Sequence, residues 1–171
     1  MGLLPPRQRG LTRILLKLYL WLMRAVIQRV SEASVTVDGT MISSIGPGML
    51  VLQGVEVGDT AEDMDYLVRK IAALRIFDDE EGVMNKDIKS IGGEILLVSQ
   101  FTLLASTKKG NRPSYILAAK GPEAEPFFHL MAQALSDEIG KEVKKGRFGA
   151  DMKVRLLNDG PVTICIDSRN R

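Results

Sequence analysis

The segment Gly93–Phe101, with the sequence GEILLVSQF, places the tightest limit on the fold of this chain. A strand with one face in water alternates apolar and polar residues, whereas strands buried on both faces are apolar almost throughout. Ile95 to Val98 form an unbroken apolar run of the second kind. We therefore expect this segment to lie centrally in a sheet that is covered on both faces.

Polar residues interrupt the end of this run. Ser99, Gln100 and Thr102 surround Phe101, and in a continuing strand Ser99 and Phe101 would face one side while Gln100 and Thr102 faced the other. Buried polar side chains need partners, so these residues are either satisfied within the protein or bind a ligand. The residues alone favour the structural role.

Turn residues divide the rest of the chain after Met23 into short alternating segments. These segments predict strands at residues 24–30, 33–39, 41–46, 49–55, 142–148, 153–157 and 162–167. Most of the connections are short, which suits antiparallel pairing.

Two helices are also predicted. Thr60 and Asp63 have the spacing of a helix start, and the apolar face that follows consists of Met64, Leu67, Val68, Ile71 and Leu74. The second helix is expected from about Glu123 to Ile139, ended by Gly140. Together these elements predict an α/β mixed (α+β-like) fold, in which a mainly antiparallel β-sheet is rolled towards a barrel and two helices pack on it.

The stretch NDGPVT, residues 158–163, is the least regular part of this pattern. Asn-Asp-Gly favours a hairpin turn, with VRLL and VTICI as its two arms. Pro161 stands at the start of the second arm, where proline can donate no backbone hydrogen bond. Either Pro161 opens an edge strand, or Gly160 and Pro161 present their backbone to another molecule. The turn alone favours the edge strand.

Composition limits the chemistry. The 171 residues, 45% hydrophobic and 26% charged, suit a single domain. One histidine and one cysteine exclude a zinc site built on several histidines or on a Cys-x-x-Cys pair. His129 falls on the flank of the second predicted helix, and Cys165 alternates with Ile164 and Ile166, so we expect Cys165 to be buried. If the chain is an enzyme, it works without histidine, cysteine, metal or another cofactor.

The first 22 residues differ from the rest. They carry several arginines and one lysine, and no acidic residue occurs before Glu32. They are either a targeting segment, a poorly ordered extension, or sequence upstream of a true start at Met23. We favour the last two interpretations, and so divide the chain into an extension of unknown role, residues 1–22, and a domain, residues 23–171. No apolar run has the length of a membrane span.

Basic residues follow the central strand. Lys108, Lys109 and Arg112 lie in the polar loop after Ala105, and the net charge of the chain is +2. Such residues usually form a solvated surface. On a loop beside a binding site they would also suit a phosphate backbone, because phosphate contacts supply most non-specific affinity for nucleic acids.

Several motifs together resemble the D-aminoacyl-tRNA deacylase family. They are RAVIQRVSEASVTV, IGPGMLVLQGVEVGDT, RIFDDEEGVMN, SQFTLLA, GNRPSY, GRFGADM and NDGPVT, and they occur in the family's order from Met23 to about Asp167. The resemblance implies a cytoplasmic homodimer that hydrolyses the ester between tRNA and a D-amino acid or glycine, as chirality proofreading in translation. Its partners would be aminoacyl-tRNA and a second copy of the chain.

The resemblance also implies roles for individual residues. Ser99, Gln100, Phe101 and Thr102 match one wall of the family's catalytic pocket. Gly160 and Pro161 match a Gly-cis-Pro element that enters the pocket of the opposite subunit and leaves no room for an L side chain. Arg29 matches a basic residue that orients this element. The resemblance gives no role to Lys108, Lys109 and Arg112, but with tRNA as the substrate these loop cations are the expected tRNA contacts.

The mechanism has two candidates. Thr102 could act as the nucleophile, but the sequence places no base beside it. The alternative, which we favour, is that the ribose 2′-hydroxyl of the tRNA assists hydrolysis and the protein positions it. Two other functions remain open, namely a nucleic-acid-binding module without activity and a related deacylase with another chirality or tRNA preference.

Overall fold

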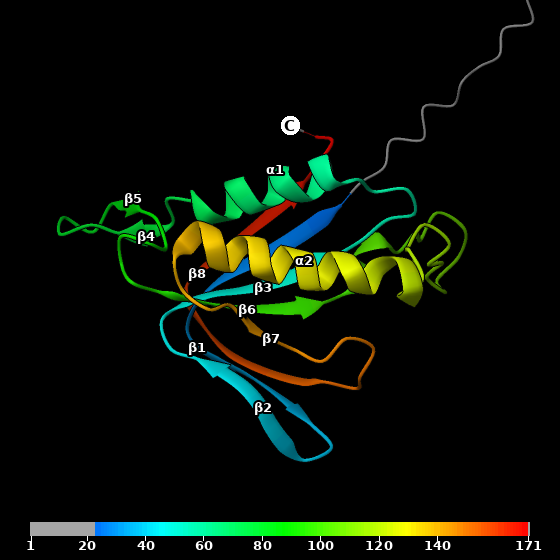
Figure 1. Ribbon diagram of the computed structural model, residues 1–171, viewed down its shortest axis with the longest axis horizontal. Helices are drawn as coiled ribbons and strands as arrows, with labels where there is room; N and C mark the ends of the chain where they lie inside the picture. The colour runs from blue at the N-terminus through cyan, green and yellow to red at the C-terminus, as the bar shows by residue number, and fades with distance from the viewer. Residues whose placement is uncertain (1–22, 171) are drawn as a thin grey trace, which may run out of the picture.

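The computed structural model describes residues 23–170, and the expected extension at residues 1–22 lies outside them. Two helices pack side by side over one face of a strongly curved sheet, whose remaining strands roll into a nearly closed barrel (Figure 1). The elements are β1 (Arg24–Val37), β2 (Thr40–Ile45), β3 (Gly48–Gly54), α1 (Ala61–Ala72), β4 (Phe77–Asp78), β5 (Met84–Lys86), β6 (Glu94–Ser99), the 3₁₀ helix η1 (Phe101–Leu104), α2 (Gly121–Ile139), β7 (Lys144–Lys145) and β8 (Lys153–Asp167).

Strand β1 organises the sheet. It is one continuous strand where the sequence predicts two, and it pairs antiparallel with β3 through residues 24–30 and with β2 through residues 33–37. Strand β8 runs antiparallel along its other edge. The order of the main path is β2-β1-β3-β6-β7, in which the pairs β3–β6 and β6–β7 are parallel. The predicted mixed fold, with a mainly antiparallel sheet and two packing helices, is confirmed.

Strand β6 is covered on both of its faces, as its sequence predicts. Ile95 and Leu97 join the core beneath the two helices, and Leu96 and Val98 join a second core inside the barrel. All four side chains are almost completely buried. Because full burial of such a side chain stabilises the fold by about 1.5–3 kcal/mol, the end of β6 is held rigidly.

The ends of both helices follow their sequence signals closely. Helix α1 begins after Thr60 with the predicted capping box, in which Asp63 is the third residue. Helix α2 begins two residues before the predicted start, because Pro122 fits the first turn of a helix, and it ends at Gly140 in the left-handed conformation. As expected, His129 lies half-exposed on the flank of α2. Its Nε2 lies 3.7 Å from the Glu125 carboxylate.

Asp63 also joins α1 to the end of the chain. Burial would raise its pKa, but hydrogen bonds from Arg169, Thr60 and Ser168 outweigh burial and lower the pKa to about 2. We expect Asp63→Asn to lower the free energy of unfolding by about 2 kcal/mol near pH 7. Since the folded pKa lies below the unfolded value of 3.8, this contribution is complete above that value and is lost as the pH falls towards 2. The free energies of unfolding of the two proteins, measured in urea across this pH range, should therefore converge at low pH.

The predicted hairpin at residues 158–160 is wrong. Strand β8 runs without reversal from Lys153 to Asp167 and pairs with β1 on both sides of the expected turn. Between the pairs Val30–Asn158 and Gln28–Thr163, β8 advances five positions while β1 advances two, which forms a wide bulge. The turn-forming residues therefore bulge out of a strand, because pairing with β1 on both sides outweighs their local preference.

The expected burial of Cys165 is also wrong. Ile164 and Ile166 are partly buried against the core beneath the helices, and Cys165 is exposed on the opposite face of β8. The predicted alternation is present, but β8 is covered on one face and the cysteine lies on the other.

Candidate active site

The segment Ser99–Thr102 leaves the sheet, so the expectation of a continuing strand is wrong. Strand β6 ends at Ser99, and Gln100 precedes the 3₁₀ helix η1 with its backbone N–H donating to the carbonyl of Gln53 at 2.7 Å. Helix η1 packs directly on β3, because a Cβ at Gly54 would lie 3.1 Å from both the Gln100 carbonyl and the Leu103 Cβ. The segment is thus a fixed corner at the end of a rigid strand.

At this corner two polar side chains are hydrogen-bonded to each other, and one aromatic side chain is exposed. The Gln100 amide donates to the Thr102 hydroxyl, which ties the two polar side chains to one another. Phe101 is 54% exposed and meets the edge of Tyr115, with ring centroids 5.0 Å apart. Phe101 and Tyr115, which is 39% exposed, thus form a small aromatic surface beside the end of β6.

A cavity of about 590 Å³ opens beside this corner. Ser99, Gln100 and Phe101 form one wall, whereas Thr102 does not line it. The remaining lining consists of Gln53, Val55, Val98, Ala119, Lys120, Gly121, Ala124, Phe128, Phe148, Gly149, Ala150, Asp151, Met152 and Val154. Its mixture of apolar walls and a few polar groups is that of a small-molecule site.

Sequence reasoning gave no role to the far wall of the cavity. Phe128 from α2 and Phe148 from the loop before β8 have ring centroids 5.9 Å apart there. The available signal was the motif GRFGADM, in which two glycines flank Phe148. Phe128 gave no signal, because an aromatic residue in an apolar stretch of a predicted helix looks like an ordinary packing residue.

Arg29, Gly160 and Pro161 form a second group on the bulge of β8. The Arg29 guanidinium is nearly buried and donates to the carbonyls of Asp159 at 2.9 Å and Ile76 at 2.7 Å, and to the Asp78 carboxylate at 3.3 Å. The Gly160–Pro161 peptide bond is cis, and both residues are exposed. Arg29 thus ties the bulge to the loop before β4.

The two groups do not meet within one chain. Arg29, Gly160 and Pro161 do not line the cavity beside η1. Lys108, Lys109 and Arg112 do not line it either; they lie exposed in the loop between η1 and α2, whose base is closed by a backbone bridge between Ser106 and Ser114.

The chemistry open to the cavity is limited. Residues 23–170 contain no cluster of three or more histidine, cysteine, aspartate or glutamate side chains suited to a metal ion. Within the same range, the Thr102 hydroxyl forms one hydrogen bond, to Gln100. The first hydrogen bond of η1 runs from Leu103 N to the Gln100 carbonyl, so the N–H groups of Phe101 and Thr102 precede it and have no partner within the helix. The corner therefore offers backbone donors rather than a nucleophile with its base.

Comparison with known proteins agrees with this picture. Residues 26–167 match the family model for D-Tyr-tRNA(Tyr) deacylase. The D-aminoacyl-tRNA deacylases of Bacteroides thetaiotaomicron and Flavobacterium johnsoniae are 62% and 58% identical over 149 residues, which is 87% of this chain and 99% of each relative.

Two solved structures share the fold. One, described as a c-Myc DNA unwinding element binding protein, is 45% identical with a TM-score of 0.80 over 84% of this chain and 97% of its own. The other, a probable eukaryotic D-amino acid tRNA deacylase, has a TM-score of 0.73 over 85% of this chain and 99% of its own at 16% identity, so that likeness concerns the fold alone. The matches to the family model and to its curated members show that the chain belongs to the D-aminoacyl-tRNA deacylase family.

Proposed function

We propose that this protein hydrolyses the ester bond of D-aminoacyl-tRNA, and of glycyl-tRNA, to give free amino acid and tRNA. The observation that carries the proposal is the cavity of about 590 Å³ that ends on Ser99, Gln100 and Phe101, in a chain 62% identical to a curated deacylase. A cavity lined by Phe128 and Phe148 suits the aminoacyl-adenosine end of tRNA, because aromatic rings stack on bases.

Rejection of L-aminoacyl-tRNA is assigned to the Gly160–Pro161 backbone of a second copy of the chain. Support comes from the position of this element, which is exposed on the bulge of β8 and does not line the cavity of its own chain. A fixed backbone wall distinguishes D from L by excluding one direction of the side chain. Glycine has no side chain to exclude and passes the same filter.

In the proposed mechanism a hydroxyl group of the tRNA itself assists hydrolysis, and the protein positions the substrate and stabilises the charge that develops. In this mechanism the ribose 2′-hydroxyl activates a water molecule that attacks the ester carbonyl, and the N–H group of Phe101, a residue that lines the cavity, stabilises the oxyanion that develops there. One such donor contributes about 3 kcal/mol in other hydrolases. The activated aminoacyl ester needs no stronger catalyst, which is consistent with a cavity that has no histidine or cysteine in its lining.

The surroundings of the cavity suit a tRNA. Lys120 lines it directly, and Lys108, Lys109 and Arg112 lie on the loop that leads from η1 to α2. We assign to these cations the binding of the phosphate backbone of the tRNA. The biological role that we propose is proofreading in the cytoplasm. No helix of residues 23–170 is long and apolar enough to cross a membrane.

The test is deacylation of D-, L- and glycyl-tRNA charged on the same tRNA. We expect rapid release from the D and glycyl substrates and little from the L substrate. Binding of tRNA without release of any amino acid would instead identify a nucleic-acid-binding module, a function that the DNA-binding description of the 45% identical structure also raises. Equal rates on D and L substrates would reject the chiral filter.

The role of Thr102 is tested by its replacement with alanine. Since the hydroxyl does not line the cavity and is bound to Gln100, we expect Thr102→Ala to keep its single-turnover rate within about tenfold. Loss of a true nucleophile costs about 10⁶-fold in a serine protease. A substrate whose terminal ribose 2′-hydroxyl is replaced by hydrogen should react more than about 10²-fold more slowly. An inactive Thr102→Ala that still folds and binds tRNA would contradict substrate assistance.

A further inference from the structure

The backbone nitrogen of Met23 is buried at the point where the described chain enters β1. Met23 is 0% exposed, and its N–H donates to the Ser168 hydroxyl at 3.2 Å, while its carbonyl accepts from Ser168 N at 3.0 Å. Its sulfur accepts a hydrogen bond from the Gln53 amide at 3.7 Å. Met23 is therefore fixed in the protein by its backbone and its side chain together.

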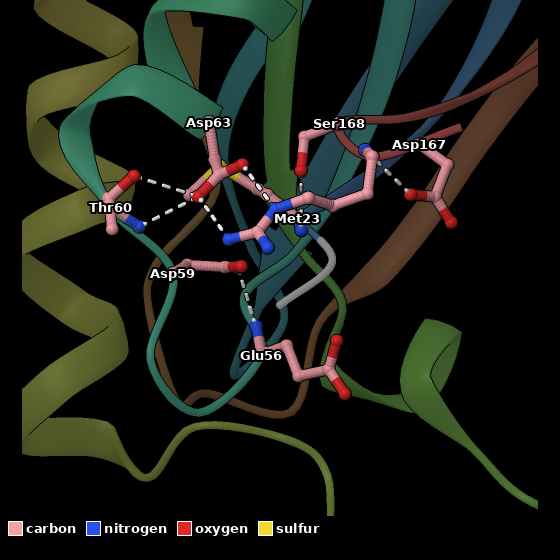
Figure 2. Close-up of polar contacts among 8 residues, drawn as sticks. Met23, Glu56, Asp59, Thr60, Asp63, Asp167 and Ser168 are labelled. Atoms are coloured by element: carbon pink, nitrogen blue, oxygen red, sulfur yellow. Dashed lines mark hydrogen bonds and ion pairs between the residues drawn. The ribbon is translucent and has the colours of Figure 1, made fainter. Parts of the chain in front are cut away.

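Acidic residues lie near this nitrogen. Figure 2 shows Met23 among Glu56, Asp59 and Asp63, which are 6%, 8% and 2% exposed; we call this group, with Ser168 and Arg169, the acidic recess. Met23 connects to Asp63 through Ser168, whose hydroxyl accepts from Met23 and also helps to lower the Asp63 pKa. A buried backbone nitrogen is thus connected through one hydroxyl to a buried carboxylate.

The arginine of the acidic recess pairs with Asp63, and one oxygen of Asp59 keeps no hydrogen-bond partner among residues 23–170. The Arg169 guanidinium pairs with Asp63, with Nε 3.2 Å from Oδ1. Asp59 uses Oδ2 to accept from Glu56 N at 2.7 Å, but its buried Oδ1 has no hydrogen-bond partner among residues 23–170. Burial, and after it the charges of Asp63 and Glu56, raise the pKa of Asp59 to about 7. Such a group is stabilised by either a proton or a further cation.

We propose that the working polypeptide begins at Met23, and that its α-ammonium group is the cation of the acidic recess. Translation starts with methionine, and a methionine nitrogen already occupies the recess. An ammonium group has three N–H donors where a peptide nitrogen has one, so it can bind a carboxylate in addition to Ser168. The curated relatives match 149 residues of this chain, which is the number from Met23 to Arg171. Neither the activity nor the dimer enters this inference.

The first test compares three chains at pH 7: residues 1–171, residues 23–171, and residues 23–171 preceded by Met-Gly. The Met-Gly chain is the matched control, because it adds only two residues and moves the charge of the α-ammonium group away from the acidic recess. We expect the chain begun at Met23 to unfold about 4 °C or more above both extended chains. Asp59→Asn should shrink this difference at least by half. Equal unfolding temperatures for the three chains would overturn the proposal.

The second test needs no substitution and so remains decisive if Asp59→Asn fails to fold. In protein 23–171 labelled with ¹³C-methionine, the pH dependence of the Met23 Cα resonance gives the pKa of the α-amine. Burial of Met23 lowers this pKa and neighbouring carboxylates raise it. If the ion pair outweighs burial, the pKa lies about one unit or more above the ordinary 7.7–8.0, and this is the value we expect. An ordinary or lowered value would refute the ion pair. The intact mass of the protein isolated from its own cells should correspond to a chain that starts at Met23, and the mass of residues 1–171 would refute that start.

Discussion

Gly160→Ala is expected to lower kcat/KM for D-aminoacyl-tRNA by at least about 10²-fold and to weaken the rejection of the L substrate, while the fold is retained. Gly160 has a φ of +124°, where L side chains are strained, and an added Cβ would lie 2.9 Å from Arg29 Nη2 and 3.0 Å from Val162 Cγ2. Arg29 cannot move aside, because it is nearly buried and bound to Ile76. The backbone of residues 159–162 must therefore shift.

The control for this substitution is Gly39→Ala in the turn between β1 and β2. Gly39 also has a positive φ, +77°, but an added Cβ would meet nothing within 4 Å. Backbone strain in Gly39→Ala should lower the free energy of unfolding by about 1–3 kcal/mol. The ratio of hydrolysis rates on the D and L substrates should stay that of the unmodified protein. A Gly160→Ala protein with an unchanged D/L ratio would show that this backbone is not the filter.

A mixed dimer tests which subunit the bulge serves. One chain carries Gly160→Ala and the other carries Phe101→Ala, a change at an exposed side chain that should leave the fold intact. If the bulge enters the opposite subunit, both lesions fall in the same pocket, so the other pocket stays intact and about half of the activity remains. If the bulge serves its own subunit, each pocket carries one lesion and activity falls to that of the damaged sites. The second result would refute the cross-subunit assignment.

The parts of the fold that the sequence predicts correctly are those set by local pattern. Burial of β6 on both faces follows from the run Ile95–Val98, and the start of α1 follows from the spacing of Thr60 and Asp63. Each of these depends on residues a few positions apart. Side-chain period and capping chemistry therefore decide them before any long-range contact forms.

The sequence-based predictions are wrong where contacts with distant segments override a local preference. Asn158 and Gly160 favour a hairpin, yet β1 pairs on both sides of them and turns the expected reversal into a bulge. Thr102 follows an apolar strand, yet contact with Gly54 of β3 sets Gln100 at the start of a 3₁₀ helix. Phe128 completes the cavity from a helix whose sequence shows only a packing face. Tertiary contacts of this kind leave no periodic trace in the sequence.

Arg29 is another residue whose importance depends on distant partners, since its hydrogen bonds reach 47 residues along the chain to Ile76 and 130 residues to Asp159. The sequence resemblance gave it an orienting role, and the geometry explains how that role would be performed. One planar guanidinium uses Nη1 for Ile76 and Nε for Asp159, and so fixes the bulge of β8 against the loop before β4.

Arg29→Ala is therefore expected to lower the free energy of unfolding by about 3–5 kcal/mol, because it leaves a cavity and a buried Ile76 carbonyl without its donor. Arg29→Lys separates stability from positioning: a single ammonium cannot reproduce two donors in a fixed plane, so part of the stability should return while kcat/KM stays low. Urea unfolding and single-turnover deacylation measure the two effects. Arg75→Ala, which removes an exposed arginine bound to Asn85, should change the free energy of unfolding by less than about 1 kcal/mol. Full activity in Arg29→Lys would mean that positive charge alone, without the guanidinium geometry, holds the bulge in place.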